Sequence, residues 1–214
     1  MNDKPASPPH LDQLHRQGLR LGAVILAGGL ARRMNGEDKG LIPIAGKTMV
    51  AHVLQTVQPQ VDVVVINANR NKDLYGAYDV PVVADAHEGH LGPLAGLCAG
   101  LATLDTELVF MCPCDSPFVD AELISRLAIA CSETDVDVAV AADAERLQPV
   151  FCIVRQRVHK SLDAFLASGE RKIDRWYATQ QMQTVNCADL EHSFRNINTE
   201  DERRAAEVHL MAQA

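Results

Sequence analysis

The residues most able to do chemistry in this chain stand together in one glycine-rich, basic segment. Gly28 and Gly29 follow a short apolar run, and two arginines and Lys39 come after them. Glycines let a backbone turn tightly and present N–H groups that no side chain obstructs. Arginine and lysine donate hydrogen bonds to phosphate oxygens. Since the chain has a formal net charge of -8, this local positive charge indicates an anionic ligand.

This segment differs from the two common phosphate-binding loops. It contains neither G-x-G-x-x-G nor G-x-x-x-x-G-K-[ST]. A glycine pair alone is typical of an ordinary turn, so the interpretation depends on features elsewhere in the chain. Adjacent arginines seldom both point at one ligand, and of Arg32 and Arg33 we favour Arg33 as the ligand contact.

The elements that must position this loop alternate regularly. Apolar runs typical of buried strands are followed by amphipathic stretches typical of helices. Five such strands, with helices between them, predict an α/β domain with a mostly parallel sheet covered by helices on both faces. The predicted strands are residues 23–25, 61–66, 80–84, 108–111 and 136–140, and the predicted helices are residues 48–57, 71–78, 94–104 and 121–131.

Polar residues follow three of these strands at the edge where such sheets bind ligands. Asp115 is expected to hold Mg2+, and Lys39 to bridge phosphates as a point charge. Asn67 and Asp85 are expected to bind a base or a sugar. The alternatives are that Asp115 is a turn residue before a proline, that Lys39 is a surface lysine, and that Asn67 ends its strand in a turn.

The rest of the chain has a looser pattern. We expect further strands at residues 149–154 and 183–185, and helices at residues 157–166, 171–177 and 201–211. Residues 1–18 are polar and proline-rich, and we expect a flexible extension with no assigned function. Residues 19–214 are expected to form a single domain, with a nucleotide half at about 19–118 and a second half at about 119–214.

Composition narrows the function classes. A hydrophobic content of 47% is typical of a globular protein. No apolar stretch approaches the roughly 18 residues that span a bilayer. The N-terminal residues also contain no apolar core of the kind found in secretory signal peptides. The acidic balance and the lack of a broad basic face argue against nucleic acid. We therefore expect a cytoplasmic protein without membrane or nucleic-acid partners. Its six cysteines are expected to be thiols, because disulfides are rare in that compartment.

Several separate segments together resemble the molybdenum cofactor guanylyltransferases of bacteria (the molybdopterin-guanine dinucleotide synthesis protein A type). The family's opening motif, L-A-G-G-x-x-x-R-M-G-G-x-D-K-G-L, is matched by residues 26–41. Further matches follow in order at residues 65–70, 92–96, 112–117, 169–171 and 196–199, so that the resemblance covers about residues 22–205.

The resemblance implies a Rossmann-like three-layer nucleotidyltransferase fold with a mostly parallel central sheet. It implies that the terminal phosphate of molybdopterin attacks the α-phosphorus of Mg-GTP, giving the guanine dinucleotide cofactor and pyrophosphate. The second half of the chain would then face the pterin. The family's binding positions correspond to Leu26, Ala27, Gly28, Gly29, Lys39, Asn67, Asp85 and Asp115, with Mg2+ at Asp115, and Arg33 joins Lys39 and Asp115 in the catalytic set.

The partners implied are GTP and molybdopterin or molybdenum-molybdopterin. Molybdenum-insertion proteins and molybdoenzyme chaperones are further candidates, and we expect a monomer. Asn35 replaces a usual glycine, but asparagine tolerates left-handed φ. Ser116 keeps the hydroxyl of the commoner threonine, and Gln148 stands where histidine is frequent.

Two alternatives come from different classes. One is a cytidylyltransferase acting on molybdopterin, although that branch tends to carry alanine early in the loop. The other is a nucleotide or cofactor carrier without turnover. Lys39 and Asp115 argue against a carrier, because a carrier needs neither leaving-group nor metal chemistry.

Overall fold

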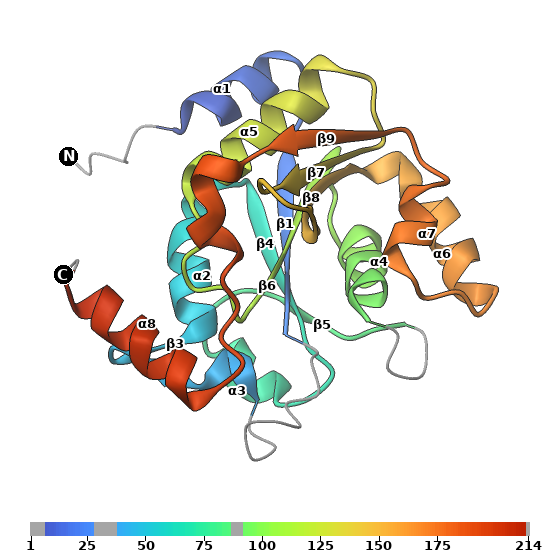
Figure 1. The fold of residues 1–214 in the computed structure, drawn as a ribbon. Coiled ribbons are helices and arrows are strands. Elements are labelled where there is room, and N and C mark those ends of the chain that lie inside the picture. Colours follow the sequence, from blue (N-terminus) through green and yellow to red (C-terminus); the bar gives the residue numbers. More distant parts are fainter. Residues whose placement is uncertain (1–6, 28–37, 87–91, 213–214) are drawn as a thin grey trace, which may run out of the picture.

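The computed structural model describes residues 7–27, 38–86 and 92–212. Its centre is a seven-stranded sheet in the order β5-β4-β1-β6-β8-β7-β9 (Figure 1). The strands of this sheet are β1 (Leu21–Leu26), β4 (Val63–Asn67), β5 (Val82–Val83), β6 (Leu108–Pro113), β7 (Val138–Ala142), β8 (Leu147–Arg155) and β9 (Met182–Asn186).

Six of these strands run in one direction, so their carboxyl ends share one edge of the sheet. β1 pairs in parallel with both β4 and β6, and β7 pairs in parallel with β9. β8 alone is reversed, because it pairs antiparallel with β6 on one side and with β7 on the other. The predicted mostly parallel sheet is confirmed.

Helices cover both faces of the sheet, because successive residues of each central strand point to opposite sides. In β1, Ala23 and Ile25 face a core shared with α1 (Pro9–Arg16), α2 (Met49–Val57) and α5 (Ala121–Glu133). Val24 faces a second core shared with α4 (Pro93–Thr103), α6 (His159–Ala167) and α7 (Ile173–Tyr177). Figure 1 shows these two helix groups on opposite sides of the strands. The three-layer fold predicted from the sequence is therefore confirmed.

The expectation of a loosely attached extension is wrong for part of residues 1–18. Helix α1 lies within that range, and its Leu11 and Leu14 are buried, with 5% and 1% of their surfaces exposed. Both leucines belong to the same hydrophobic core as α5. Polar contacts attach the helix as well, because His10 Nε2 is bonded to Gln60 O at 2.9 Å and His15 Nε2 to Asp62 Oδ1 at 2.8 Å.

Two further elements complete the edge where the strands end. β2 (Pro43–Ile44) and β3 (Lys47–Thr48) form a small antiparallel hairpin that was not predicted. α8 (Glu200–Ala212) contacts this hairpin, and Ala206 of α8 joins Ile44 in a small hydrophobic cluster. Segments from opposite ends of the chain therefore meet beside the carboxyl ends of the strands.

The cysteines behave as the sequence predicted. All six are buried free thiols, and burial raises the pKa of Cys98 to about 11 and that of Cys152 to about 12. They act as small apolar side chains in the two cores. Within the described ranges, no helix combines the length and the hydropathy that crossing a bilayer requires.

Candidate active site

The candidate site begins where the chain leaves β1. β1 lies between β4 and β6 in the sheet. The chain passes from β1 to β4 and β5 on one side and then returns to β6 on the other side. Such a reversal in strand order opens a crevice at the carboxyl ends, which is where open α/β sheets bind ligands. Ala27 N donates to Asn67 O at 2.8 Å, and Cys114 N donates to Leu26 O at 2.9 Å. These backbone bonds hold the ends of all three strands together.

The predicted loop residues Gly28, Gly29 and Arg33, with the neighbouring Arg32, lie outside the described residues. The structure describes the chain again from Asp38, so the apolar start and the basic end of the loop are both placed.

Lys39 and Asp115 meet although they are far apart in sequence. Lys39 Nζ lies 3.1 Å from Asp115 Oδ2 and 2.5 Å from Asn198 Oδ1. The pair is only partly open to solvent, with 21% of the Lys39 side chain and 14% of the Asp115 side chain exposed. Partial burial weakens screening by water, so the attraction between this ammonium group and the Asp115 carboxylate is stronger than at an exposed ion pair.

The partner Asn198 belongs to a segment that the sequence analysis noted as a motif but gave no role. Ile197 N donates to Asp115 O at 2.9 Å, and Ser116 Oγ contacts Asn196 Oδ1 at 2.7 Å. Residues 196–198 therefore run alongside the turn that follows β6. Spacing along the chain gives no signal for this contact, because Lys39 and Asn198 are 159 positions apart.

A capping arrangement at the start of α8 fixes this segment. Glu202 Oε2 accepts hydrogen bonds from Asn198 N at 2.6 Å and Thr199 N at 2.9 Å, and Glu202 N donates to Thr199 Oγ1 at 3.2 Å. Reciprocal bonds of this kind satisfy the backbone donors at a helix start. The same bonds lower the pKa of Glu202, so the carboxylate stays ionised near Lys39.

Asn67 and Asp85 form a second cluster, at the ends of β4 and β5. Asn67 Nδ2 donates to Asp85 Oδ1 at 2.9 Å, and Asn69 Nδ2 donates to Asp85 Oδ2 at 2.8 Å. Asp85 N in turn donates to Asn69 Oδ1 at 2.9 Å. The structure thus brings together two predicted residues and adds Asn69, a residue that follows the same predicted strand as Asn67 and had no predicted role.

Gly96 explains how α4 comes so close to this cluster. A Cβ at Gly96 would overlap with Asn67 Oδ1 and with Leu26 Cδ2. The helix can therefore rest on the ends of β1 and β4 only because this position has no side chain.

The residues at the site fit a magnesium ion that is shared with a polyphosphate. The ammonium group of Lys39 already lies between two oxygen ligands, the Asp115 carboxylate and the Asn198 amide. Mg2+ prefers oxygen ligands and is usually held by one or two carboxylates together with substrate phosphates and waters. Among the residues that the structure describes, no group of three or more His, Cys, Asp or Glu is arranged to hold a metal alone.

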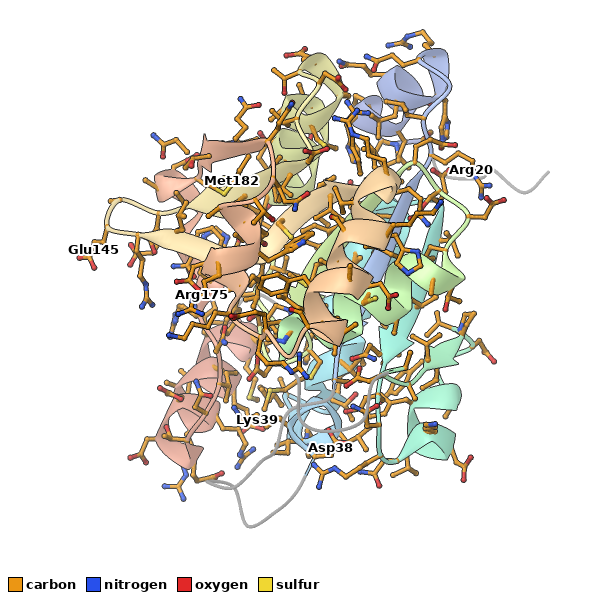
Figure 2. The ribbon with its side chains drawn as sticks, turned by 90° about the vertical axis from the view of Figure 1, so that its right-hand side faces the viewer. Arg20, Asp38, Lys39, Glu145, Arg175 and Met182 are labelled. Atoms are coloured by element: carbon orange, nitrogen blue, oxygen red, sulfur yellow. The ribbon has the colours of Figure 1, made fainter. Side chains whose placement is uncertain are left out.

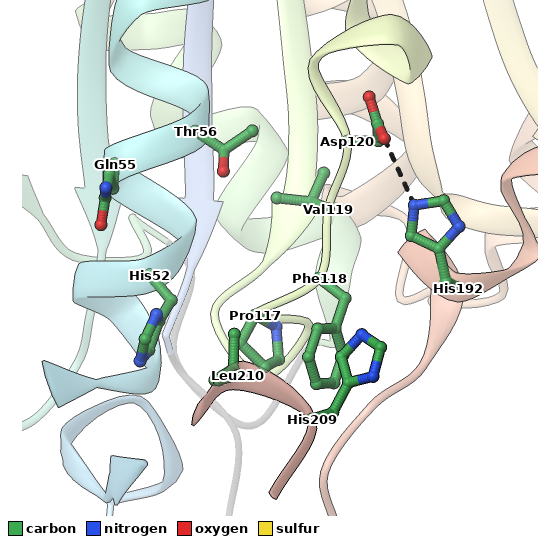
Figure 3. A pocket seen from close by; sticks show the side chains of 10 residues that line it. All are labelled: His52, Gln55, Thr56, Pro117, Phe118, Val119, Asp120, His192, His209 and Leu210. Carbon is green, nitrogen blue, oxygen red and sulfur yellow. Dashed lines mark hydrogen bonds and ion pairs between the residues drawn. The ribbon is translucent and has the colours of Figure 1, made fainter. Parts of the chain in front are cut away.

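A separate cavity of about 450 Å3 lies beside the segment that follows Ser116 (Figure 3). None of the predicted site residues lines it. Its His192 Nε2 lies 3.3 Å from Asp120 Oδ2, and its His52 Nε2 is bonded to a backbone oxygen. These histidines therefore have local partners and do not converge on one point.

Comparison with known proteins gives the class of protein that this fold and site define. The sequence model of the MobA-like NTP transferase domain matches residues 23–185. The chain belongs to this nucleotidyltransferase family. Within it, the chain is a member of the molybdenum cofactor guanylyltransferases, as two relatives of that name indicate.

The relative from Shewanella sp. (strain MR-4) is 42% identical over 89% of this chain and 98% of its own length. The relative from Shewanella amazonensis is 45% identical over 86% of this chain and 94% of its own length. Molybdopterin-guanine dinucleotide biosynthesis protein A from Archaeoglobus fulgidus shares the fold, with a TM-score of 0.77 at 23% identity over 90% of this chain and all of that one.

Proposed function

We propose that this protein transfers GMP from GTP to the terminal phosphate of molybdopterin, releasing pyrophosphate. The observation that carries the proposal is the meeting of Lys39 and Asp115 at the carboxyl edge of the sheet, in a chain of this family. The attacking phosphate oxygen forms a bond to the α-phosphorus, and the bond from that phosphorus to the pyrophosphate oxygen breaks. The acceptor is molybdopterin or molybdenum-molybdopterin.

At the phosphate end of the site, we assign the triphosphate to Lys39 and to the backbone that follows Leu26 and Ala27. We also assign Gly28, Gly29 and Arg33 to the binding of the triphosphate. Lys39 offers a point charge that can stabilise the departing pyrophosphate. Its present partners, Asp115 and Asn198, aim the ammonium group into the crevice.

Asp115, with Asn198 beside it, would hold Mg2+. A bound Mg2+ neutralises the charge that develops on the phosphoryl oxygens. The residues themselves contribute orientation: the backbone bond from Ile197 N to Asp115 O fixes the turn that carries the carboxylate, and Lys39 Nζ contacts the carboxylate itself.

At the nucleoside end, we assign Asn67 and Asp85 to recognition of guanosine. Guanine presents paired N–H donors, which suit a carboxylate or backbone carbonyls. The bonds from Asn67 and Asn69 fix the Asp85 carboxylate in place while leaving it lone pairs for further donors. The relatives are named as guanylyltransferases, which favours GTP over CTP.

Incubation of the purified protein with Mg2+, molybdopterin and either GTP or CTP tests this function, with pyrophosphate release as the measurement. Release with GTP alone is the expected result. Release with CTP would keep the mechanism and overturn the base assignment. Binding of nucleotide without any release would favour the carrier alternative.

Gly96 provides a test of the nucleoside end. We expect Gly96→Ala to weaken GTP binding about tenfold and to lower the free energy of unfolding by about 1–3 kcal/mol, because the new methyl group displaces the Asn67 amide or the helix. Calorimetric titration with GTP and thermal unfolding measure the two effects. Gly76→Ala in α3 (Lys72–Gly76) is the matched control, since nothing lies within 4 Å of its added Cβ. Unchanged GTP affinity in Gly96→Ala would remove Asn67 from the proposal.

We place the reaction in the cytoplasm, with the protein acting as a monomer whose single domain spans residues 19–214 together with the packed helix α1. Six free thiols suit a reducing compartment. The continuous sheet supports one domain, because β6 of the nucleotide half pairs with β8 of the half assigned to the pterin. Molybdenum-insertion proteins and molybdoenzyme chaperones remain the proposed further partners.

A further inference from the structure

The residue before Lys39 is a buried carboxylate whose presence needs a reason. Asp38 is 9% exposed and stands beside a lysine that we assign to a polyphosphate. Figure 2 shows both residues at the same end of the molecule, opposite the end that carries Arg20. Burying a carboxylate is costly unless it is bonded, and a negative charge here repels phosphate. Lys39 does not neutralise it, because its Nζ is directed to Asp115 and Asn198.

Two side chains bind this carboxylate instead: one belongs to α3, and the other belongs to the residue just before α3. Tyr75 Oη donates to Asp38 Oδ1 at 2.5 Å, and Asn71 Nδ2 donates to Asp38 Oδ2 at 3.1 Å. Asn71 precedes the first residue of α3, and Tyr75 N donates to Asn71 O at 3.1 Å, so the first turn of α3 holds the two donors close together. Tyr75 is fully buried, and burial raises the pKa of its hydroxyl, which therefore keeps the proton that it donates.

The residue after Lys39 is held just as closely. A Cβ at Gly40 would stand 2.5 Å from Tyr75 Oη and 3.0 Å from Cys114 Sγ. The backbone at Gly40 therefore lies directly between Tyr75 and the residue before Asp115. Both neighbours of Lys39 are thus fixed against Tyr75, while Lys39 itself remains directed into the crevice.

We infer that Tyr75 and Asn71 are positioning residues for the nucleotidyl transfer, which hold Asp38 and thereby direct Lys39 at the phosphates. The inference rests on the proposed function, since it assigns Lys39 to GTP. Tyr75 acts through Asp38 and does not touch substrate. The carboxylate is then the anchor by which α3 fixes the end of the phosphate loop.

Tyr75→Phe removes only the hydroxyl and is the first variant. We expect kcat/KM for GTP to fall about 30-fold, because a lysine misplaced by about 1 Å loses much of its effect at the phosphates. The KM for molybdopterin should stay unchanged. Tyr78→Phe is the matched control, since the hydroxyl that it removes is bonded at 2.6 Å to Thr48 Oγ1, at the start of α2, and not to Asp38. Equal activity of the two variants would overturn the inference.

A double-mutant cycle with Asp38 separates positioning from general loosening. If Tyr75 acts through Asp38, then Tyr75→Phe combined with Asp38→Ala loses no more activity than the worse single variant. Asp38→Asn should lose less activity than Asp38→Ala, because its amide oxygen can still accept a hydrogen bond from the Tyr75 hydroxyl. If the activity losses of the two single variants multiply in the double variant, Tyr75 does not act through Asp38 and the inference is contradicted.

A second variant covers the case in which Tyr75→Phe does not fold. Asn71 has a positive φ of 51°, so Asn71→Gly deletes the amide and keeps a backbone that glycine adopts freely. We expect about a fivefold loss in kcat/KM, because one of two donors to Asp38 remains. Full activity of Asn71→Gly would count against the inference.

The same variants are titrated with GTP in the presence of Mg2+, so that the inference can fail separately from the proposed function. Wild-type protein that binds GTP without transfer would refute the function, while weaker GTP binding in Tyr75→Phe than in Tyr78→Phe would still support the positioning role. Wild-type turnover with equal binding and equal turnover in both tyrosine variants would refute the positioning role alone.

Discussion

Replacing Asp115 by asparagine is expected to lower kcat about 1,000-fold or more while leaving measurable GTP binding. A loss of this size corresponds to about 4 kcal/mol of transition-state stabilisation. Asparagine keeps the shape of the side chain and the backbone bond from Ile197 N, but it removes the negative charge that would hold Mg2+. Pyrophosphate release and calorimetric GTP binding, measured on the same preparation, separate the two effects.

The control for this variant is Asp12→Asn on α1, an exposed carboxylate in a helix that packs near the opposite end of the strands (Figure 1). It should behave as wild type. Turnover within tenfold of wild type in Asp115→Asn would remove Asp115 from the metal site. A carrier without turnover would retain its full effect in the variant, so the result also decides between the two classes.

Replacing Lys39 by methionine is expected to lower kcat/KM for GTP about 100-fold, which corresponds to about 2.7 kcal/mol. Methionine has a similar length and no charge, so the change isolates the ammonium group. The loss arises at the phosphates, where the ammonium stabilises both the bound triphosphate and the departing pyrophosphate. Initial rates across a GTP concentration series give the measurement.

Lys47→Met is the matched control for Lys39. Lys47 lies on β3, is exposed, and donates to Gln55 Oε1 at 2.8 Å. It should retain wild-type kinetics, since its charge is in solvent. A Lys39→Met enzyme with an unchanged kcat/KM would show that the contact with Asp115 is a structural ion pair only.

The regular part of the fold was predictable because its strands are buried on both faces. Continuous runs such as Val63–Asn67 and Leu108–Pro113 have few other interpretations, and the helices between them follow at the expected spacing. The parallel edge follows from the alternation of strands and helices. Candidate site residues could then be read from positions just beyond each strand, which is how Asn67, Asp85 and Asp115 were selected.

The rest of the fold depended on partners distant in sequence. The run that forms β8 reads as a strand in either direction, and only pairing with β6 and β7 makes it antiparallel. Helix α1 is too short for its periodicity to be decisive and is attached by Leu11 and Leu14. The hairpin of β2 and β3 has two residues in each strand, which leaves no periodicity to detect.

The same limit applies to the site. Asn198 resembles any residue ahead of a helix, and Tyr75 resembles any aromatic residue of a core. Their roles come from hydrogen bonds to Lys39 and Asp38, which no local pattern contains. Sequence reasoning therefore found the groups at the strand ends and missed those that hold them in place.

The contact between Lys39 and Asn198 also bears on when the site forms during folding. It closes a loop of 159 residues, and the entropy cost of closure grows with loop length. Parallel strands near one another in the chain can pair earlier than such distant segments. A newly made molecule is therefore expected to assemble its sheet first and its phosphate site last. Only a fully folded chain would then catalyse the reaction of GTP.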